Sequence, residues 1–299
     1  MLYGYLIIVL AVILTALVSG NNLSAAVGTL IGSRIVSRIG GIIIGILGFT
    51  SGLLIQGESL ADTATKLIPR SSQIIVFALL IALIIFALAT YFRVPLSLIM
   101  ALVGVSIGLS YRFGYPEHTY LIRIIILTWI IAPLASIALG FALNRKLTGL
   151  QPKNVWNFAL SLKLALVAVS FLTAFTLGAN TLGFIEQISG LGGFGVIYMI
   201  IGIVLGSVFL SKGVIRRVGQ EMYLMRYTNA FVALIVSSAL VEGATLIGLP
   251  LSNTQTLTSS VFGTGLSYRN KLMEIRPFLI TVATWILSPL LGIICGLLA

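Results

Sequence analysis

The sequence predicts an all-α polytopic membrane protein with roughly 10 transmembrane helices, built as two transmembrane repeats. Three observations lead to this fold class: the composition, the recurrence of long apolar runs, and an internal duplication. Of the 299 residues, 59% are hydrophobic and 8% are charged, whereas a soluble domain carries about 25% charged residues. The mean hydropathy is +1.14. No polar segment is long enough to form a soluble domain.

Apolar runs of membrane-spanning length recur along the whole chain, and each predicts a helix because unpaired backbone is too costly in lipid. The first run could be interpreted as a cleaved signal sequence, but it lacks a basic n-region and is interpreted here as the first span. Basic residues occur in nearly every loop, so charge asymmetry predicts no orientation. The clearest runs are residues 2–19, 74–91, 120–143, 196–210, 229–249 and 278–299.

The chain contains an internal duplication. Four segments recur in the same order, at offsets of 155 to 159 residues. "ATYFRVPLS" from Ala89 returns as "ATLIGLPLS" from Ala244, and "TWIIAPL" from Thr128 returns as "TWILSPL" from Thr284. "GLSYR" occurs twice, and "SGNN" has a looser counterpart in "GANT". We therefore predict a first repeat at residues 1–143, a linker at 144–154 and a second repeat at 155–299.

Duplicated membrane halves are typical of secondary transporters, whose sites lie at matched breaks in discontinuous helices. Pro95 and Pro250 each interrupt an apolar run, and proline suits the first position of a new helix. Small and amide residues at 19–22 and 178–181 predict a second pair of breaks. Isolated glycines and serines could equally serve helix packing, but recurrence at matched places favours a site.

The rare residue types exclude several function classes. Cys295, His118 and Asp62 are each the only residue of their type, which argues against disulfides, a cysteine or histidine metal cluster, and most nucleophile–base pairs. We expect no enzyme and no nucleic-acid partner. The formal net charge of +11 fits positive loops beside anionic lipid, or an electrostatic bias toward anionic solutes.

The motifs resemble those of the inorganic phosphate transporter (PiT-type) family, with a sulfate-permease-like branch as an alternative. "SGNNLSAAVGT" and "GANTLG" are similar to its G-A-N-D signature, and "GLPLSNTQTLTSSVFGTG" is similar to its G-L-P-V-S-T-T-H motif. "VPLSLIMALVGVSIG" is similar to the first-half copy of that motif. The resemblance covers both halves and implies inverted repeats with re-entrant hairpins, a homodimer, and cation-coupled import of phosphate or sulfate.

Eight substrate-binding residues follow from the resemblance, position by position. The G-A-N-D sites are Asn21, Asn22, Asn180 and Thr181, and the P-V-S-T-T sites are Ser97, Ser252, Asn253 and Thr254. The sequence departs from the family where Asn22 and Thr181 replace two aspartates. In the first half Leu98, Ile99 and Met100 replace the residues Thr-Thr-His.

The chemistry of these residues favours an anion. A helix beginning after Pro250 would present hydroxyl and amide donors beside free backbone N–H groups, which suits an oxyanion. A site without carboxylates favours sulfate, because hydrogen phosphate carries a proton that needs an acceptor. A sodium ion near Asn21 and Asn180, or a proton, could be the coupling ion, and no other cofactor is expected.

Ionisable residues within spans are the remaining candidates, since they are costly in lipid. Glu186 and Glu242 could carry coupling; alternatively, Glu186 lies at a water-exposed hairpin end and Glu242 pairs with a base. The sequence therefore predicts a secondary active importer of phosphate or sulfate in the cell membrane, multi-pass, of a prokaryote. An uncoupled anion channel or facilitator is the alternative.

Overall fold

The structure, a computed structural model, describes residues 2–92, 94–149, 153–211, 226–267 and 274–299, and these residues are helical apart from short connections. The first half holds α1 (Leu2–Gly32), α2 (Arg38–Gln56), the 3-10 turn η1 (Gly57–Leu60), α3 (Ala61–Leu67), α4 (Ser72–Phe92), α5 (Leu98–Phe113) and α6 (Thr119–Thr148). The second holds α7 (Val155–Leu177), the π-helical η2 (Gly178–Leu182), α8 (Gly183–Ser189), α9 (Gly192–Leu205), the π-helical η3 (Gly206–Leu210), α10 (Tyr227–Leu246), α11 (Asn253–Ser267) and α12 (Arg276–Leu298).

The prediction of an all-α polytopic membrane protein is confirmed. Among the described residues, eight helical stretches are long and apolar enough to cross a membrane. α5 and α11, with 16 and 15 residues, are shorter than a span requires,. Large apolar side chains on the outer faces of the long helices are exposed, such as Ile130, Leu134 and Ile286. Such a surface suits lipid rather than water.

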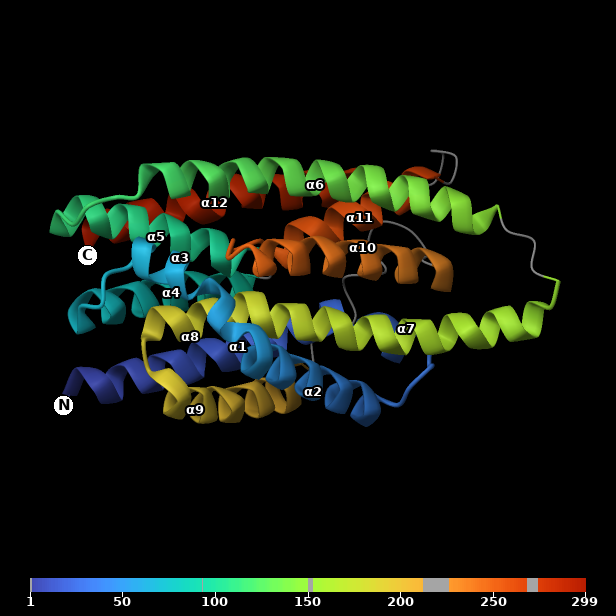
Figure 1. The fold of residues 1–299 in the computed structure, drawn as a ribbon, viewed down its shortest axis with the longest axis horizontal. Helices are drawn as coiled ribbons and strands as arrows, with labels where there is room; N and C mark the ends of the chain where they lie inside the picture. The colour runs from blue at the N-terminus through green and yellow to red at the C-terminus, as the bar shows by residue number, and fades with distance from the viewer. Residues whose placement is uncertain (1, 93, 150–152, 212–225, 268–273) are drawn as a thin grey trace.

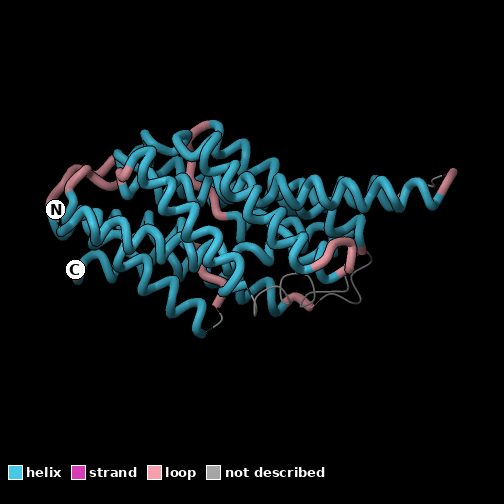
Figure 2. Tube along the Cα trace, turned by 90° about the horizontal axis from the view of Figure 1, so that it is seen from below, coloured by secondary structure: helices cyan, strands magenta, loops and turns pink. Residues whose placement is uncertain are grey.

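The two halves run in opposite directions along the molecule. α1 begins at the left end of Figure 1 and α7 at the right end, while α6 runs from left to right and α12 from right to left. α4 and α5 lie toward the left end, and α10 and α11 extend to the right. Both chain termini lie at the left end, as Figure 2 also shows. This arrangement is the inverted repeat that the resemblance implies.

The predicted proline breaks are confirmed, and one of the other breaks is wrong. α4 ends at Phe92 and α5 begins at Leu98, while α10 ends at Leu246 and α11 begins at Asn253. At 178–181 the helix changes to π geometry, but α1 continues unbroken through Ser19–Asn22. The Ser19 hydroxyl donates to the carbonyl of Thr15 at 2.8 Å within the same helix, which satisfies a hydroxyl that would otherwise compete with the helix.

The halves exchange packing partners. α5 packs against α12 and α11 against α6, while α2 packs against α7 and α9 against α1. Two glycines permit matched close approaches: a Cβ on Gly52 would overlap the carbonyl oxygen of Phe175, and a Cβ on Gly206 would overlap that of Ala16. The predicted linker begins within α6, which extends through Thr148, and its residues 150–152 lie outside the described residues.

Candidate anion site at the hairpin tips

The tip of the second hairpin, between α10 and α11, starts a helix with a polar first turn. Pro250 precedes α11, and the hydroxyl of Ser252 accepts a hydrogen bond from the backbone N–H of Gln255 at 3.4 Å. The Ser252 side chain therefore acts as an N-cap. The N–H groups of Asn253 and Thr254 stand at the first two helical positions, which have no intrahelical acceptor. Ser252 and Asn253 are buried, and Thr254 is half-buried.

Asn180, in the π-helical segment η2, holds this tip in place. Its amide Nδ2 donates to the carbonyl of Leu249 at 3.1 Å and to the hydroxyl of Thr245 at 2.8 Å. Its Oδ1 accepts from the backbone N–H of Leu251 at 3.1 Å. The side chain is fully buried, so it satisfies backbone groups that would otherwise be unpaired on either side of Pro250.

A buried hydroxyl orients Asn253. Ser237 on α10 donates to Oδ1 of Asn253 at 3.1 Å and lies 2.7 Å from the hydroxyl of Thr256. The oxygen of the Asn253 amide is thereby occupied. Its Nδ2 makes no hydrogen bond within the part of the chain that the structure describes, so this group remains a donor beside the free N–H groups of α11.

The tip of the first hairpin keeps the geometry but not the polar side chains. The hydroxyl of Ser97 accepts from the N–H of Met100 at 3.4 Å and caps α5. The backbone N–H of Ser97 donates to the hydroxyl of Ser288 at 3.2 Å. The next three side chains, Leu98, Ile99 and Met100, are apolar and buried, so donors at this tip come from the backbone.

Each tip is held by the last long helix of the opposite half. Trp129 on α6 donates from Nε1 to the carbonyl of Pro250 at 3.1 Å. Thr284 on α12 donates from its hydroxyl to the carbonyl of Pro95 at 3.0 Å. The amide of Gln255 donates to the carbonyl of Trp129 at 3.3 Å, so α6 and the second tip are linked twice.

The remaining residues of the G-A-N-D sites are not linked to the tips by hydrogen bonds. Asn21 and Asn22 lie half-buried on the continuous helix α1, and their side chains make no hydrogen bond to any described residue. Thr181 is buried in η2 beside Asn180. The structure therefore brings together Asn180, Ser252 and Asn253, and it places Asn21, Asn22 and Ser97 on other elements.

The two carboxylates in spans have neutral partners. Glu186 on α8 is only 5% exposed and accepts a hydrogen bond from the side chain of Gln187, so the alternative of a water-exposed hairpin end is wrong. Glu242 on α10 accepts from Nε2 of Gln56 at 2.7 Å. In the described ranges the only ion pair is Lys66–Asp62, so Glu242 has no basic partner there.

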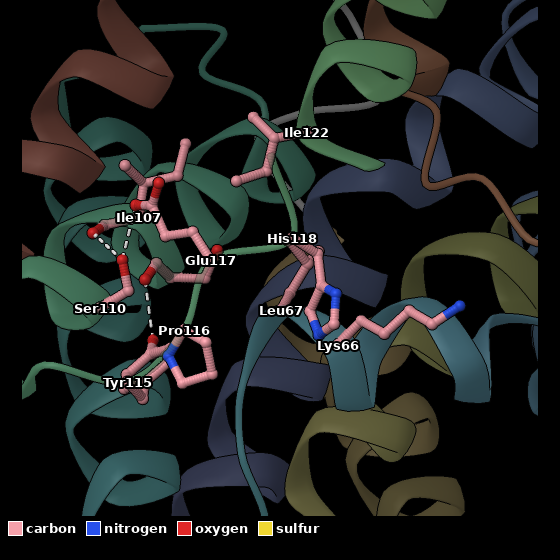
Figure 3. A pocket seen from close by; sticks show the side chains of 10 residues that line it. Lys66, Leu67, Ile107, Ser110, Tyr115, Pro116, Glu117, His118 and Ile122 are labelled. Atoms are coloured by element: carbon pink, nitrogen blue, oxygen red, sulfur yellow. Dashed lines mark hydrogen bonds between the residues drawn. The ribbon is translucent and has the colours of Figure 1, made fainter. Parts of the chain in front are cut away.

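A small pocket lies away from the tips, at the opposite end of α5. Figure 3 shows the Tyr115 hydroxyl donating to the carbonyl of Ser106, and the Ser110 hydroxyl donating to Glu117. Burial and the nearby Glu117 carboxylate raise the pKa of Tyr115 above its ordinary value. None of the eight predicted binding residues lines this pocket, and His118 lies at its rim as a loop residue.

Sequence reasoning missed the residues that support the second tip: Ser237, Thr245, Trp129, Gln255 and Thr256. Trp129 carried a signal, since its segment "TWIIAPL" recurs in the second half. Gln255 and Thr256 belong to the polar run after Pro250. Ser237 and Thr245 lie in an apolar run with nothing to separate them from packing residues. Across the ranges the structure describes, no group of three histidine, cysteine, aspartate or glutamate side chains could hold a metal.

Inverted halves, with two hairpins whose tips begin short helices, are typical of membrane transporters. The model of the phosphate transporter family matches residues 18–192 and 160–296. The chain therefore belongs to the phosphate transporter family, which confirms the resemblance in its motifs.

Known proteins agree with this assignment. The chain is 23% identical to a Methanocaldococcus jannaschii protein named "putative phosphate permease", over 97% of this chain and 94% of that protein. It is 31% identical over 84 residues to a Bacillus subtilis protein named "probable low-affinity inorganic phosphate transporter", covering 28% of this chain and 25% of the relative. A solved structure titled "The sodium-dependent phosphate transporter" has the same fold, with a TM-score of 0.83 at 16% identity, covering 100% of this chain and 98% of that one.

Proposed function

We propose that this chain is a secondary active transporter that imports inorganic phosphate by ion-coupled symport. Family membership supports phosphate as the transported ion. The inverted halves support alternating access, in which one repeat moves against the other around a central site. The proposal assigns the site to the two hairpin tips, with residues 1–143 and 155–299 as the moving repeats.

The observation that carries the proposal is the first turn of α11. The buried side chains of Ser252 and Asn253 lie there beside the helix N-terminus, at the tip of the hairpin between α10 and α11. A helix N-terminus favours an anion through its free N–H groups and its dipole. Asn180 fixes the backbone around Pro250, so the donors are held in place before an anion binds. Ser97 and the α5 N-terminus would complete the site from the other half.

Two alternatives are tested by the same measurements. Transport could be an uncoupled anion leak, because no carboxylate occupies the G-A-N-D sites of this sequence. The anion could be sulfate, because the second tip offers hydroxyl and amide groups rather than a carboxylate to accept the phosphate proton. Sodium is favoured as the coupling ion over a proton, since the solved structure with the same fold is titled as sodium-dependent.

The test is uptake of labelled phosphate and sulfate into proteoliposomes under separate sodium and proton gradients. We expect phosphate to accumulate above its external concentration, and sulfate to compete weakly. Equilibration without accumulation under either gradient would establish the uncoupled alternative, and sulfate-only uptake would overturn the assignment of the substrate.

Three variants locate the site. We expect Ser252→Ala and Asn253→Ala each to lower phosphate kcat/KM by about 10-fold to 100-fold, the range for hydrogen bonds to a charged group. Thr258→Ala is the matched control, because Thr258 is a half-buried hydroxyl on the same helix beyond its first turn. Asn22→Ala tests whether α1 contributes to the same site. An unchanged kcat/KM in both tip variants would refute this site.

A further inference from the structure

Two polar side chains meet inside the predicted membrane spans although they are 186 residues apart in the sequence. Gln56 is the last residue of α2, and Glu242 lies on α10. Nε2 of Gln56 donates to Oε1 of Glu242 at 2.7 Å. The contact joins the first repeat to the second, and none of the motifs that define the hairpin tips includes either residue.

The pair leaves two buried oxygens without donors. Oε1 of Gln56 and Oε2 of Glu242 have no hydrogen-bond partner within the described residues. Both atoms are acceptors only, since the amide oxygen and the carboxylate oxygen carry no proton. An unpaired acceptor buried from water is costly, and a buried carboxylate more so. The pair therefore offers two oxygen ligands to a cation.

Among the described residues, no basic side chain supplies a positive charge to the pair. Glu242 forms no ion pair with any described residue. The helices and turns with the most contacts to α10 carry charged residues at five positions, and α2 adds Arg38 at the end opposite Gln56. None of them is paired with Glu242: Glu58 on η1, Lys163 on α7, and Arg123, Arg145 and Lys146 on α6.

The backbone adds negative potential at the same place. α2 passes directly into the 3-10 turn η1 after Gln56, and Glu242 lies one turn before the end of α10 at Leu246. The C-terminus of α10 carries partial negative charge, which favours a cation. Carbonyls at the ends of interrupted membrane helices are recurrent ligands for sodium in transporters.

The pair lies one helical turn from the second hairpin tip. Thr245 follows Glu242 by three residues on α10 and accepts a hydrogen bond from Asn180 at 2.8 Å. Asn180 in turn holds Leu249 and Leu251 on either side of Pro250. A charge bound at Glu242 is thus connected through α10 and Asn180 to the backbone that presents the donors of α11.

We propose that Gln56 and Glu242 bind the coupling cation, a sodium ion, between α2 and α10. The two side-chain oxygens and carbonyls at the helix ends supply the hard oxygen ligands that such a cation prefers. The proposal rests on the proposed ion-coupled symport and names the coupling site for it. It also explains how a chain with Asn22 and Thr181 in place of aspartates retains a carboxylate for a cation.

The experiment measures binding of radioactive sodium to the purified full-length protein without phosphate, and separately the sodium dependence of phosphate uptake. We expect Glu242→Gln to weaken sodium binding by about 10-fold to 100-fold, because the variant loses the only charged ligand. Gln56→Ala should weaken binding in the same direction while removing no charge. It serves as a second test if Glu242→Gln does not fold.

Two controls separate this site from the anion site. Glu58→Gln removes a carboxylate two residues beyond Gln56 whose side chain is exposed, and it should leave sodium binding unchanged. Asn253→Ala should impair phosphate uptake but not sodium binding in the absence of phosphate. Unchanged sodium binding in both Glu242→Gln and Gln56→Ala would overturn the proposal. Phosphate accumulation driven by a proton gradient, in a protein that binds no sodium, would also overturn the sodium site. That outcome would leave the proposed ion-coupled symport intact.

Discussion

Replacing Asn180 by alanine should destabilise the protein far more than replacing its repeat counterpart, Asn21. The amide of Asn180 pairs with the carbonyl of Leu249 and the N–H of Leu251, while Thr245 retains its own bond to the carbonyl of Val241 at 2.8 Å. The substitution leaves one buried N–H and one buried carbonyl unpaired, each costing about 1–2 kcal/mol. The expected loss is about 2–4 kcal/mol in the free energy of unfolding.

The assay is thermal unfolding of each purified variant in the same detergent, with phosphate uptake measured in parallel. Asn21→Ala is the matched control, because Asn21 occupies the same place in the first repeat and its side chain makes no hydrogen bond to a described residue. We expect a clear fall in the unfolding temperature of Asn180→Ala and little change in that of Asn21→Ala. Equal shifts in the two variants would refute the conclusion that Asn180, unlike Asn21, holds a hairpin tip.

Three further predictions follow from the same contacts. Ser237→Ala removes the hydrogen bond to Oδ1 of Asn253. In uptake assays it should raise the KM for phosphate by about fivefold, the equivalent of one neutral hydrogen bond. An unchanged KM would show that Ser237 does not orient Asn253. Trp129→Phe removes the hydrogen bond to the carbonyl of Pro250 and should lower the free energy of unfolding by about 1 kcal/mol. Trp285→Phe should not lower it, because the buried Nε1 of Trp285 has no partner in the described part of the chain. A larger loss of stability in Trp285→Phe would contradict this prediction. Gly52→Ala places a methyl group against the carbonyl of Phe175 and should reduce the yield of monodisperse protein in size-exclusion chromatography, while Gly4→Ala, which meets nothing within 4 Å, should leave it unchanged.

The fold class and its two repeats could be predicted from the sequence, because the duplication is visible in short recurring segments. Pro95 and Pro250 interrupt apolar runs at the same place in each half, and proline has a definite effect on a helix. The two hairpin tips were therefore predictable. The same argument failed at Ser19–Asn22, because small and polar residues permit a break without requiring one, and Ser19 can satisfy its hydroxyl within a continuous helix.

The contacts within the candidate site were less predictable than its location. The resemblance marked Asn180 as a ligand, but in the structure all of its hydrogen bonds go to the protein. A motif shows which residues recur but not whether a side chain is turned toward a ligand or toward the backbone. The partnership of Gln56 with Glu242 was also hidden, since hydropathy identifies spans without indicating which spans are neighbours.

The exchange of packing partners has a consequence for how the protein is made. When the first half leaves the ribosome, α2 and α5 can pack against α1 and α4, but their main partners α7 and α12 belong to the second half and have not been synthesised. Until the second half is inserted, the first half lies in the bilayer with the small-residue faces of its helices in contact with lipid. Assembly is therefore expected as one late event, in which both halves close on each other, and neither half expressed alone should reach its native packing.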